Sequence, residues 1–182
     1  MSIFFLSIFK KFLSSGIVPI IFLFFISIAI FSPYLFFDKI PSGEEDIGVY
    51  YPAMFFYQNA ISEGQSFLWN SFYYGGFPTF LNFFGGFFYP LHYFLFKFLP
   101  LFLAYHIAQT FAVFLGMTFS YLFGRANGFS KIGSLILSLS YTISQTLGGL
   151  DTGLSYSNGF MVLPLLLFVI TKIKQASSFK SG

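Results

Sequence analysis

Long runs of apolar residues, separated by short polar segments, dominate the pattern of this chain. Residues 17–37 carry no charged side chain over 21 positions, and about 20 consecutive apolar residues suffice for a helix to cross a bilayer. Three further apolar runs, at 100–123, 131–150 and 159–173, are bounded by glycine, arginine or lysine. The pattern predicts an all-α integral membrane protein whose residues 1–182 form one membrane domain with four transmembrane helices.

A long segment, 38–99, separates the first two predicted spans. Within it, 52–62 begins with proline and is followed by Gly64, as is typical of a short helix. Its polar and apolar side chains fall on opposite faces, which predicts a helix lying in the membrane interface. The polar face is Gln58, Asn59, Ser62 and Glu63, and the apolar face is Met54, Phe55 and Ile61.

The composition agrees with a membrane protein and excludes several functions. The chain is 56% hydrophobic and 8% charged, whereas soluble domains are about 25% charged. Because it has no cysteine, disulfides, thiol catalysis and thiolate metal sites are excluded. The net charge of +3 is not gathered into a basic patch, so we expect membrane lipid and not nucleic acid as a partner.

The distribution of charge predicts the orientation. With the N-terminus in the cytoplasm, seven of the nine basic residues fall on the cytoplasmic side, and all six acidic residues fall outside. This bias follows the positive-inside rule. We therefore predict a multi-pass protein of the cell membrane with both termini cytoplasmic and 38–99 as an outer loop. Lys39 and Lys97 are the two basic residues on the outer side.

Two sets of polar residues lie inside the predicted spans. His106, Gln109 and Thr110 share one helical face. They either line a substrate cavity below the outer loop or make hydrogen bonds between helices, and the spacing leaves both open. Five small hydroxyl residues repeat every four positions in the third span and predict a surface for close helix packing. They are Ser130, Ser134, Ser138, Thr142 and Thr146.

The acidic residues of the outer loop divide into structural and chemical candidates. Ser42 and Glu45 fit a capping box, which gives Glu45 a structural role. Asp46 either favours a first helical turn or acts as a general base with a pKa raised by partial burial. Asp46 and Glu44 with His92 offer oxygen and nitrogen ligands for a divalent metal, but nothing in the sequence brings them together and no metal site is assigned. For Asp151 we favour a helix cap.

An ordered set of short motifs follows the first predicted span. They are DIGVYYP at 46–52, EG at 63–64, LWN at 68–70, GGFP at 75–78 and YP at 89–90. In this order they resemble the N-terminal part of bacterial YfhO-like membrane proteins, which belong to the GT-C class of polytopic glycosyltransferases. The resemblance implies transfer of a sugar from a polyprenyl-phosphate donor to a cell-envelope glycan or lipid acceptor on the outer face. It also implies that Asp46 deprotonates the acceptor hydroxyl.

Resemblance and topology together define a candidate site around Asp46. The departing lipid phosphate needs a cation or hydrogen-bond donors, for which Lys39, His92 and Lys97 are the outer-side candidates. Trp69 and Asn70 either contact substrate or form a turn anchored in the interface. The candidate substrate-binding residues are Glu44, Tyr50, Tyr51, Trp69, Asn70, His92 and His106.

The chain departs from its apparent relatives in two ways. They often carry Gln in place of Tyr50 and Pro in place of Phe67, and they have many more spans, so we expect residues 1–182 to be an N-terminal fragment. The competing hypothesis is a non-catalytic assembly or flippase-like subunit that keeps the architecture. A channel or transporter is disfavoured because the predicted span cores contain no Asp, Glu, Lys or Arg.

Overall fold

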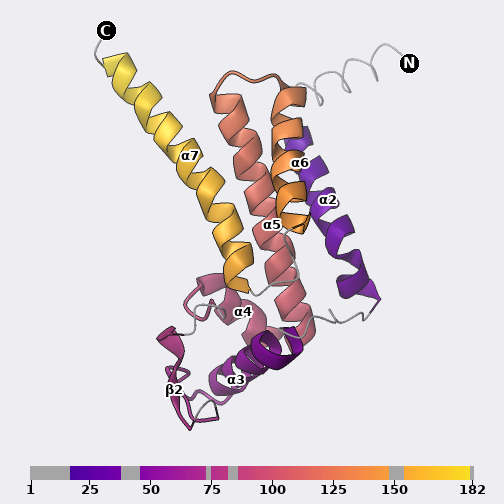
Figure 1. The fold of residues 1–182 in the computed structure, drawn as a ribbon, viewed down its shortest axis with the longest axis vertical. Helices are drawn as coiled ribbons and strands as arrows, with labels where there is room; N and C mark the ends of the chain where they lie inside the picture. The colour runs from indigo at the N-terminus through magenta and orange to yellow at the C-terminus, as the bar shows by residue number, and fades with distance from the viewer. Residues whose placement is uncertain (1–16, 38–45, 73–74, 82–85, 148–153, 181–182) are drawn as a thin grey trace.

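A computed structural model of the chain describes residues 17–37, 46–72, 75–81, 86–147 and 154–180. Helices dominate this part, with one small antiparallel hairpin (Figure 1). The long helices are α2 (Ile17–Phe36), α5 (Leu101–Ala126), α6 (Lys131–Leu147) and α7 (Leu154–Lys180). The shorter elements are the π-helical turn η1 (Asp46–Tyr50), α3 (Tyr51–Ser62), β1 (Trp69–Asn70), β2 (Phe77–Pro78), the 3₁₀ turn η2 (Thr79–Leu81) and α4 (Pro90–Phe98).

Helix α5 lies at the centre of the bundle and packs against α2, α6 and α7. Ala104, Ala108, Ala112 and Gly116 are buried and spaced four residues apart along it, so other helices approach closely. Three residues of the predicted polar stripe, Ser134, Ser138 and Thr142, are buried, whereas Ser130 is exposed and precedes α6. The Ser138 hydroxyl donates to the Met117 carbonyl of α5 at 2.8 Å.

The long helices alternate in direction. A short turn at 127–130 joins α5 to α6, and the Gln175 side chain donates to the Ala126 carbonyl at 2.6 Å. The part of α7 near Gln175 is therefore at the same end of the bundle as the C-terminal end of α5. Arg125, Lys131, Lys172 and Lys174 consequently share one end of the bundle, which we call the basic end (Figure 1). Elements α3, α4 and the β1–β2 hairpin lie at the other end, the hairpin end.

Three helices among the described residues are long and apolar enough to cross a membrane: Ile17–Phe36, Leu101–Ala126 and the Ser157–Ser177 part of α7. Many large apolar side chains of α2 and α7 are exposed, as expected for surfaces that face lipid. The described part of α6 has 17 residues, about 26 Å at 1.5 Å per residue, which is short of an approximately 30 Å hydrocarbon core. The chain is thus an all-α, membrane-associated protein, and a fourth span stays a prediction.

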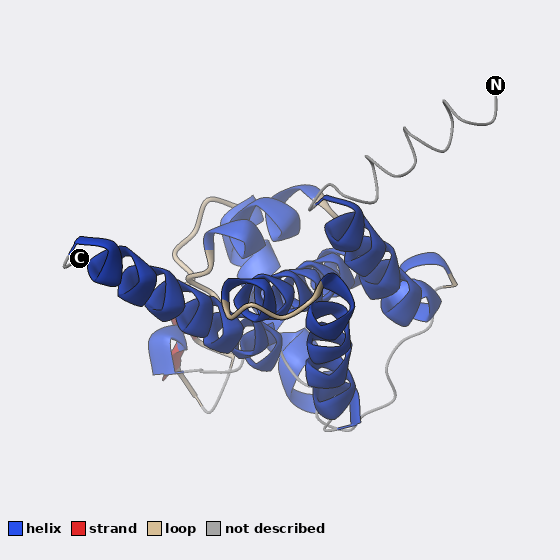
Figure 2. Ribbon diagram, turned by 90° about the horizontal axis from the view of Figure 1, so that it is seen from above, coloured by secondary structure: helices blue, strands red, loops and turns tan. Residues whose placement is uncertain are grey.

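Helix α7 extends well beyond the apolar run at 159–173. It begins at Leu154 and continues through Lys172 and Lys174 to Lys180, and away from its start it diverges from the other helices (Figures 1 and 2). The charged residues mark where the apolar run ends, but exposed lysines are good helix formers and do not stop the backbone. Pro164 is buried inside the helix without ending it.

Helix α3 occupies the predicted 52–62 position and lies across the hairpin end (Figure 1). The predicted faces are partly wrong. Met54 and Ile61 are buried, but Phe55 is 55% exposed. Gln58 does not face water: its Nε2 donates to the carbonyls of Phe96 and Leu99 at 2.8 and 2.7 Å. These carbonyls at the C-terminal end of α4 lack intrahelical donors, so Gln58 caps α4, a helix that the sequence analysis did not identify.

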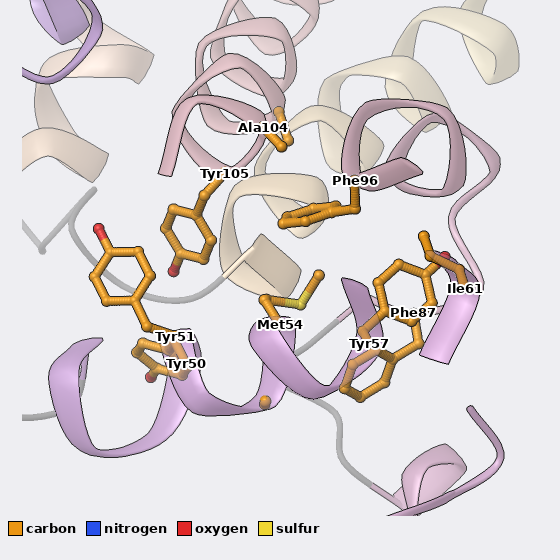
Figure 3. Close-up of a cluster of buried hydrophobic side chains, with 11 residues drawn as sticks. Tyr50, Tyr51, Met54, Tyr57, Ile61, Phe87, Phe96, Ala104 and Tyr105 are labelled. Carbon is orange, nitrogen blue, oxygen red and sulfur yellow. The ribbon is translucent and has the colours of Figure 1, made fainter. Parts of the chain in front are cut away.

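A buried aromatic cluster holds α3 against α4 and α5. Figure 3 shows Met54 and Tyr57 of α3 facing Phe96 of α4 and Tyr105 of α5, with Phe87 beside Tyr57. The Tyr57 ring lies 5.0–5.9 Å from those of Phe67, Phe87 and Phe96 in edge or tilted arrangements. Such pairs contribute about 0.5–1.5 kcal/mol each beyond their buried area, so α3 is a packed part of the fold.

Candidate functional site

A cavity of about 460 Å³ opens between α3 and the segment that includes β1. It combines aromatic walls with a few polar groups, which is the usual make-up of a ligand site. Its lining residues are Pro52, Phe55, Phe56, Asn59, Ala60, Glu63, Gln65, Asn70 and Phe72. We call it the hairpin-end cavity.

Glu63 and Gln65 form the polar rim of this cavity. Gln65 Nε2 donates to Glu63 Oε2 at 2.8 Å, and both side chains are exposed. Gly64 between them has φ +66°, a left-handed conformation that glycine adopts without strain and that ends α3. The Gln65 amide then donates to the Ala60 carbonyl at 2.8 Å. The local turn therefore places the two side chains side by side.

Asn70 supplies the buried polar group of the cavity. It is 8% exposed, and its Oδ1 accepts a hydrogen bond from the Phe72 amide at 2.9 Å, which is a turn typical of asparagine. This leaves the side-chain Nδ2 as the group that can donate to a ligand. The hairpin is fixed by Thr79, whose hydroxyl donates to the Phe67 carbonyl at 2.6 Å.

Trp69 does not line the cavity. Its side chain is 57% exposed, and its ring lies against Gly76, where an added Cβ would come within 2.6 Å of the indole. The position fits the predicted alternative of an interfacial turn. A ring that is exposed yet packed against its hairpin is typical of tryptophan at the headgroup level of a membrane.

His106, Tyr51 and Tyr50 belong to the helix packing. Tyr51 Oη and His106 Nε2 are 3.1 Å apart, and His106 Nδ1 is 3.1 Å from Gln109 Oε1. Because a carbonyl oxygen only accepts, Nδ1 carries the proton and Nε2 accepts from the Tyr51 hydroxyl. The imidazole also stacks on Tyr34 of α2 at 4.9 Å. Of the two alternatives for His106, the structure favours the interhelical hydrogen bond. Tyr50 is buried in the aromatic cluster.

His92 is not a cation for a lipid phosphate. It is completely buried, its Nδ1–H donates to the Gly86 carbonyl at 2.8 Å, and burial lowers its pKa to about 4. The ring is therefore neutral near pH 7, because a charged imidazole would lose its hydration. The Nζ atom of Lys97 lies 5.3 Å from the Tyr93 ring centroid. Neither His92 nor Lys97 lines the hairpin-end cavity.

Several predicted residues fall outside the part of the chain that the structure describes. They include Lys39, Glu44, Asp151 and the Ser42–Glu45 capping box. For Asp46 the backbone is described: it begins η1, which continues directly into α3. Asp46 lies six positions before Pro52, the first residue of the cavity lining. In the described ranges, no three His, Cys, Asp or Glu side chains gather to hold a metal.

Of the residues that line the cavity, Asn70 is the one predicted from the sequence as a candidate site residue. The signal for Asn59 and Glu63 was present, since residues four apart share a helix face, but that face was interpreted as facing solvent. The contributions of Gln65 and Phe72 depend on how the chain folds back after α3, for which no local pattern exists. Comparisons of the chain with known protein families, curated proteins and solved structures find no match.

Proposed function

We propose that this protein transfers a sugar from a polyprenyl-phosphate donor to an acceptor hydroxyl at the membrane surface, with Asp46 as the general base. The observation that carries the proposal is the hairpin-end cavity, which combines three phenylalanine rings with one carboxylate and three side-chain amides. Aromatic rings stack on the apolar face of a sugar ring, and amides and carboxylates bind its hydroxyls.

The position of the cavity supports this proposal. It lies at the hairpin end, opposite the basic end formed by α5, α6 and α7. By the positive-inside rule the basic end is cytoplasmic, so the cavity opens on the outer face, where the resemblance implies that transfer occurs. Asp46 lies six positions before the lining residue Pro52, on a turn that continues directly into α3. The proposed reaction requires the acceptor hydroxyl of the bound ligand to come within hydrogen-bond distance of the Asp46 carboxylate.

The proposed reaction is a single displacement. The acceptor hydroxyl gives its proton to the Asp46 carboxylate, and its oxygen forms a bond to the anomeric carbon of the donor sugar. The bond from that carbon to the phosphate oxygen breaks, and the polyprenyl phosphate leaves with the electron pair. None of the described residues that line the cavity is Lys, Arg or His, so the cavity suits the sugar, and the phosphate requires donors elsewhere.

The lack of cations in the described lining also favours an alternative function without catalysis. A non-catalytic assembly or flippase-like subunit needs to hold a sugar without stabilising a departing phosphate. In that case the cavity would bind the sugar and no transfer would follow.

Substitution of Asp46 by Asn distinguishes these two functions. If Asp46 is the base, Asp46→Asn lowers the transfer rate by about 10²–10⁴-fold in membranes that contain equal amounts of protein, while sugar binding persists. Asp38→Asn, a second acidic residue of the predicted outer loop, is the matched control and should keep full activity. Undiminished transfer by Asp46→Asn would exclude Asp46 as the base, and sugar binding without transfer by the unmodified protein would indicate the subunit role.

A further inference from the structure

The described lining of the hairpin-end cavity contains one acidic side chain and no basic one. Its charged lining residue is Glu63, and no ion pair engages Glu63 among the described residues. We propose that the ligand bound here carries an ammonium group, as an amino sugar does. This inference rests on the proposed function in taking the cavity as the sugar site, and it names the chemical class of that sugar.

The phenylalanine rings provide the first attraction. Phe55 and Phe72 are 55% and 88% exposed, so their faces are open to a ligand, and Phe56 completes the aromatic wall. A cation within about 6 Å of an aromatic ring centroid is attracted to the ring face, and ammonium ligands are the best-known case. Neutral hydroxyl groups gain nothing comparable from these rings.

Glu63 provides the second attraction. Gln65 donates to its Oε2 at 2.8 Å, which fixes the carboxylate and leaves Oε1 to accept from a ligand. Hydrogen bonds between an ammonium and a carboxylate are roughly twice as strong as neutral ones.

The backbone of α3 also attracts a positively charged ligand group. Asn59, Ala60 and Glu63, all lining residues, lie at the C-terminal end of this 12-residue helix. The helix dipole places partial negative charge at that end, which stabilises a nearby cation. Ring faces, carboxylate and helix end therefore all favour a cation and disfavour a phosphate or carboxylate ligand.

An ammonium group has two sources at a membrane surface: an amino sugar, or the headgroup of an ethanolamine- or choline-containing lipid. The cavity chemistry is the same for both. The two sources are distinguished by probes that carry the sugar ring with the ammonium group, the ring alone, or the ammonium group alone.

The test uses the whole protein in nanodiscs of phosphatidylglycerol, a lipid without an amine. Trp69 is the sole tryptophan and is the neighbour in sequence of the lining residue Asn70, so its fluorescence is used as the signal for binding. The probes are glucosamine, which has a ring and an ammonium; N-acetylglucosamine, which has the ring alone; and ethanolamine, which has the ammonium alone. We expect glucosamine to bind at least about tenfold more tightly than N-acetylglucosamine.

Two variants probe the cavity and one serves as the control. Glu63→Gln keeps the shape and removes the charge, and should weaken glucosamine binding about tenfold. Phe72→Leu keeps an apolar side chain without a ring face, and should weaken it about two- to fivefold. Phe80→Leu changes an exposed phenylalanine that does not line the cavity and should leave binding unchanged.

Each result decides the inference. Equal binding of the two sugars, unaffected by Glu63→Gln, would overturn the ammonium inference and leave the sugar site standing. Tight binding of ethanolamine with no gain from the sugar ring would support the ammonium inference, assign it to a lipid headgroup and overturn the proposed sugar site. Absence of binding by all three probes would overturn both.

Discussion

His92 shows how burial alone changes the role of a residue. Its ring lies between Gly86, whose carbonyl accepts the Nδ1 proton, and the Tyr89 ring at 5.0 Å. Its Nε2 is buried without a hydrogen-bond partner among the described residues. Gly86 has φ +60°, and a Cβ there would come within 2.9 Å of the imidazole. The Gly86 carbonyl favours the charged ring, but burial outweighs this effect, so the site favours a neutral imidazole.

The lowered pKa of His92 predicts a loss of stability in acid. In the folded protein the pKa is about 4, compared with the ordinary 6.5, so between these values the unfolded chain binds more protons. Stability is then fully present above pH 6.5 and decreases as the pH falls towards 4, by about 3 kcal/mol in total. Unfolding of the detergent-solubilised protein at pH 7, 5.5 and 4.5 measures this effect.

The variant His92→Asn isolates the contribution of the imidazole. Asparagine keeps a donor for the Gly86 carbonyl but does not titrate, so its stability should vary much less between pH 7 and 4.5. An equally steep pH dependence in both proteins would mean that other groups cause the acid effect.

At the scale of elements, the contact of α5 with α7 depends on one glycine. A Cβ on Gly116 would lie 2.5 Å from the Phe160 ring. Phe160 cannot easily move away, because its ring stacks on Tyr141 at 4.4 Å and its carbonyl accepts from the Tyr141 hydroxyl at 2.9 Å. The close approach of these helices therefore requires the absence of a side chain at position 116.

Two glycine substitutions test this contact. Gly116→Ala should lower the free energy of unfolding by about 1–3 kcal/mol, because the added methyl group overpacks the interface. Gly159→Ala is the matched control on α7, where a Cβ would meet nothing within 4 Å, and it should be neutral or stabilising by up to about 1 kcal/mol. Thermal unfolding measures both, and equal midpoints for the two variants would contradict the packing argument.

At the scale of the whole molecule, the basic residues of α5, α6 and α7 lie at the opposite end of the bundle from the cavity. This arrangement predicts that the basic end is cytoplasmic and the hairpin end is outside. The chain contains no cysteine, so single cysteines report the orientation without background. Ser71→Cys, at an exposed position between β1 and β2, should react with a membrane-impermeant maleimide in intact cells. Ser177→Cys, at an exposed position near the end of α7, should react only after the membrane is permeabilised.

The labelling pattern also bears on the proposed function. The reverse pattern would place the hairpin-end cavity in the cytoplasm and would exclude transfer on the outer face. Labelling of both positions in intact cells would show that an even number of spans lies between Ser71 and Ser177. That result would contradict a bundle in which α6 runs opposite to α5 and α7.

Local signals in the sequence determined the elements of this protein. Uncharged apolar runs predicted α2, α5 and most of α7, because a helix that crosses lipid must be apolar along its length. Pro52 and Gly64 predicted the ends of α3, because proline fits a first turn and glycine takes the left-handed conformation that ends a helix. The serine stripe predicted the packing face of α6 for a similarly local reason.

Only the tertiary structure decided what those elements do together. Tyr51 meets His106 across 55 residues, Gln58 turns away from water to cap α4, and Asn59, Glu63 and Gln65 meet Phe72 around a cavity. None of these contacts has a local pattern, because they depend on which side of each helix its neighbours cover. Periodicity defines the faces of a helix, but the packing of distant segments decides which face is buried, which is exposed and which lines a site.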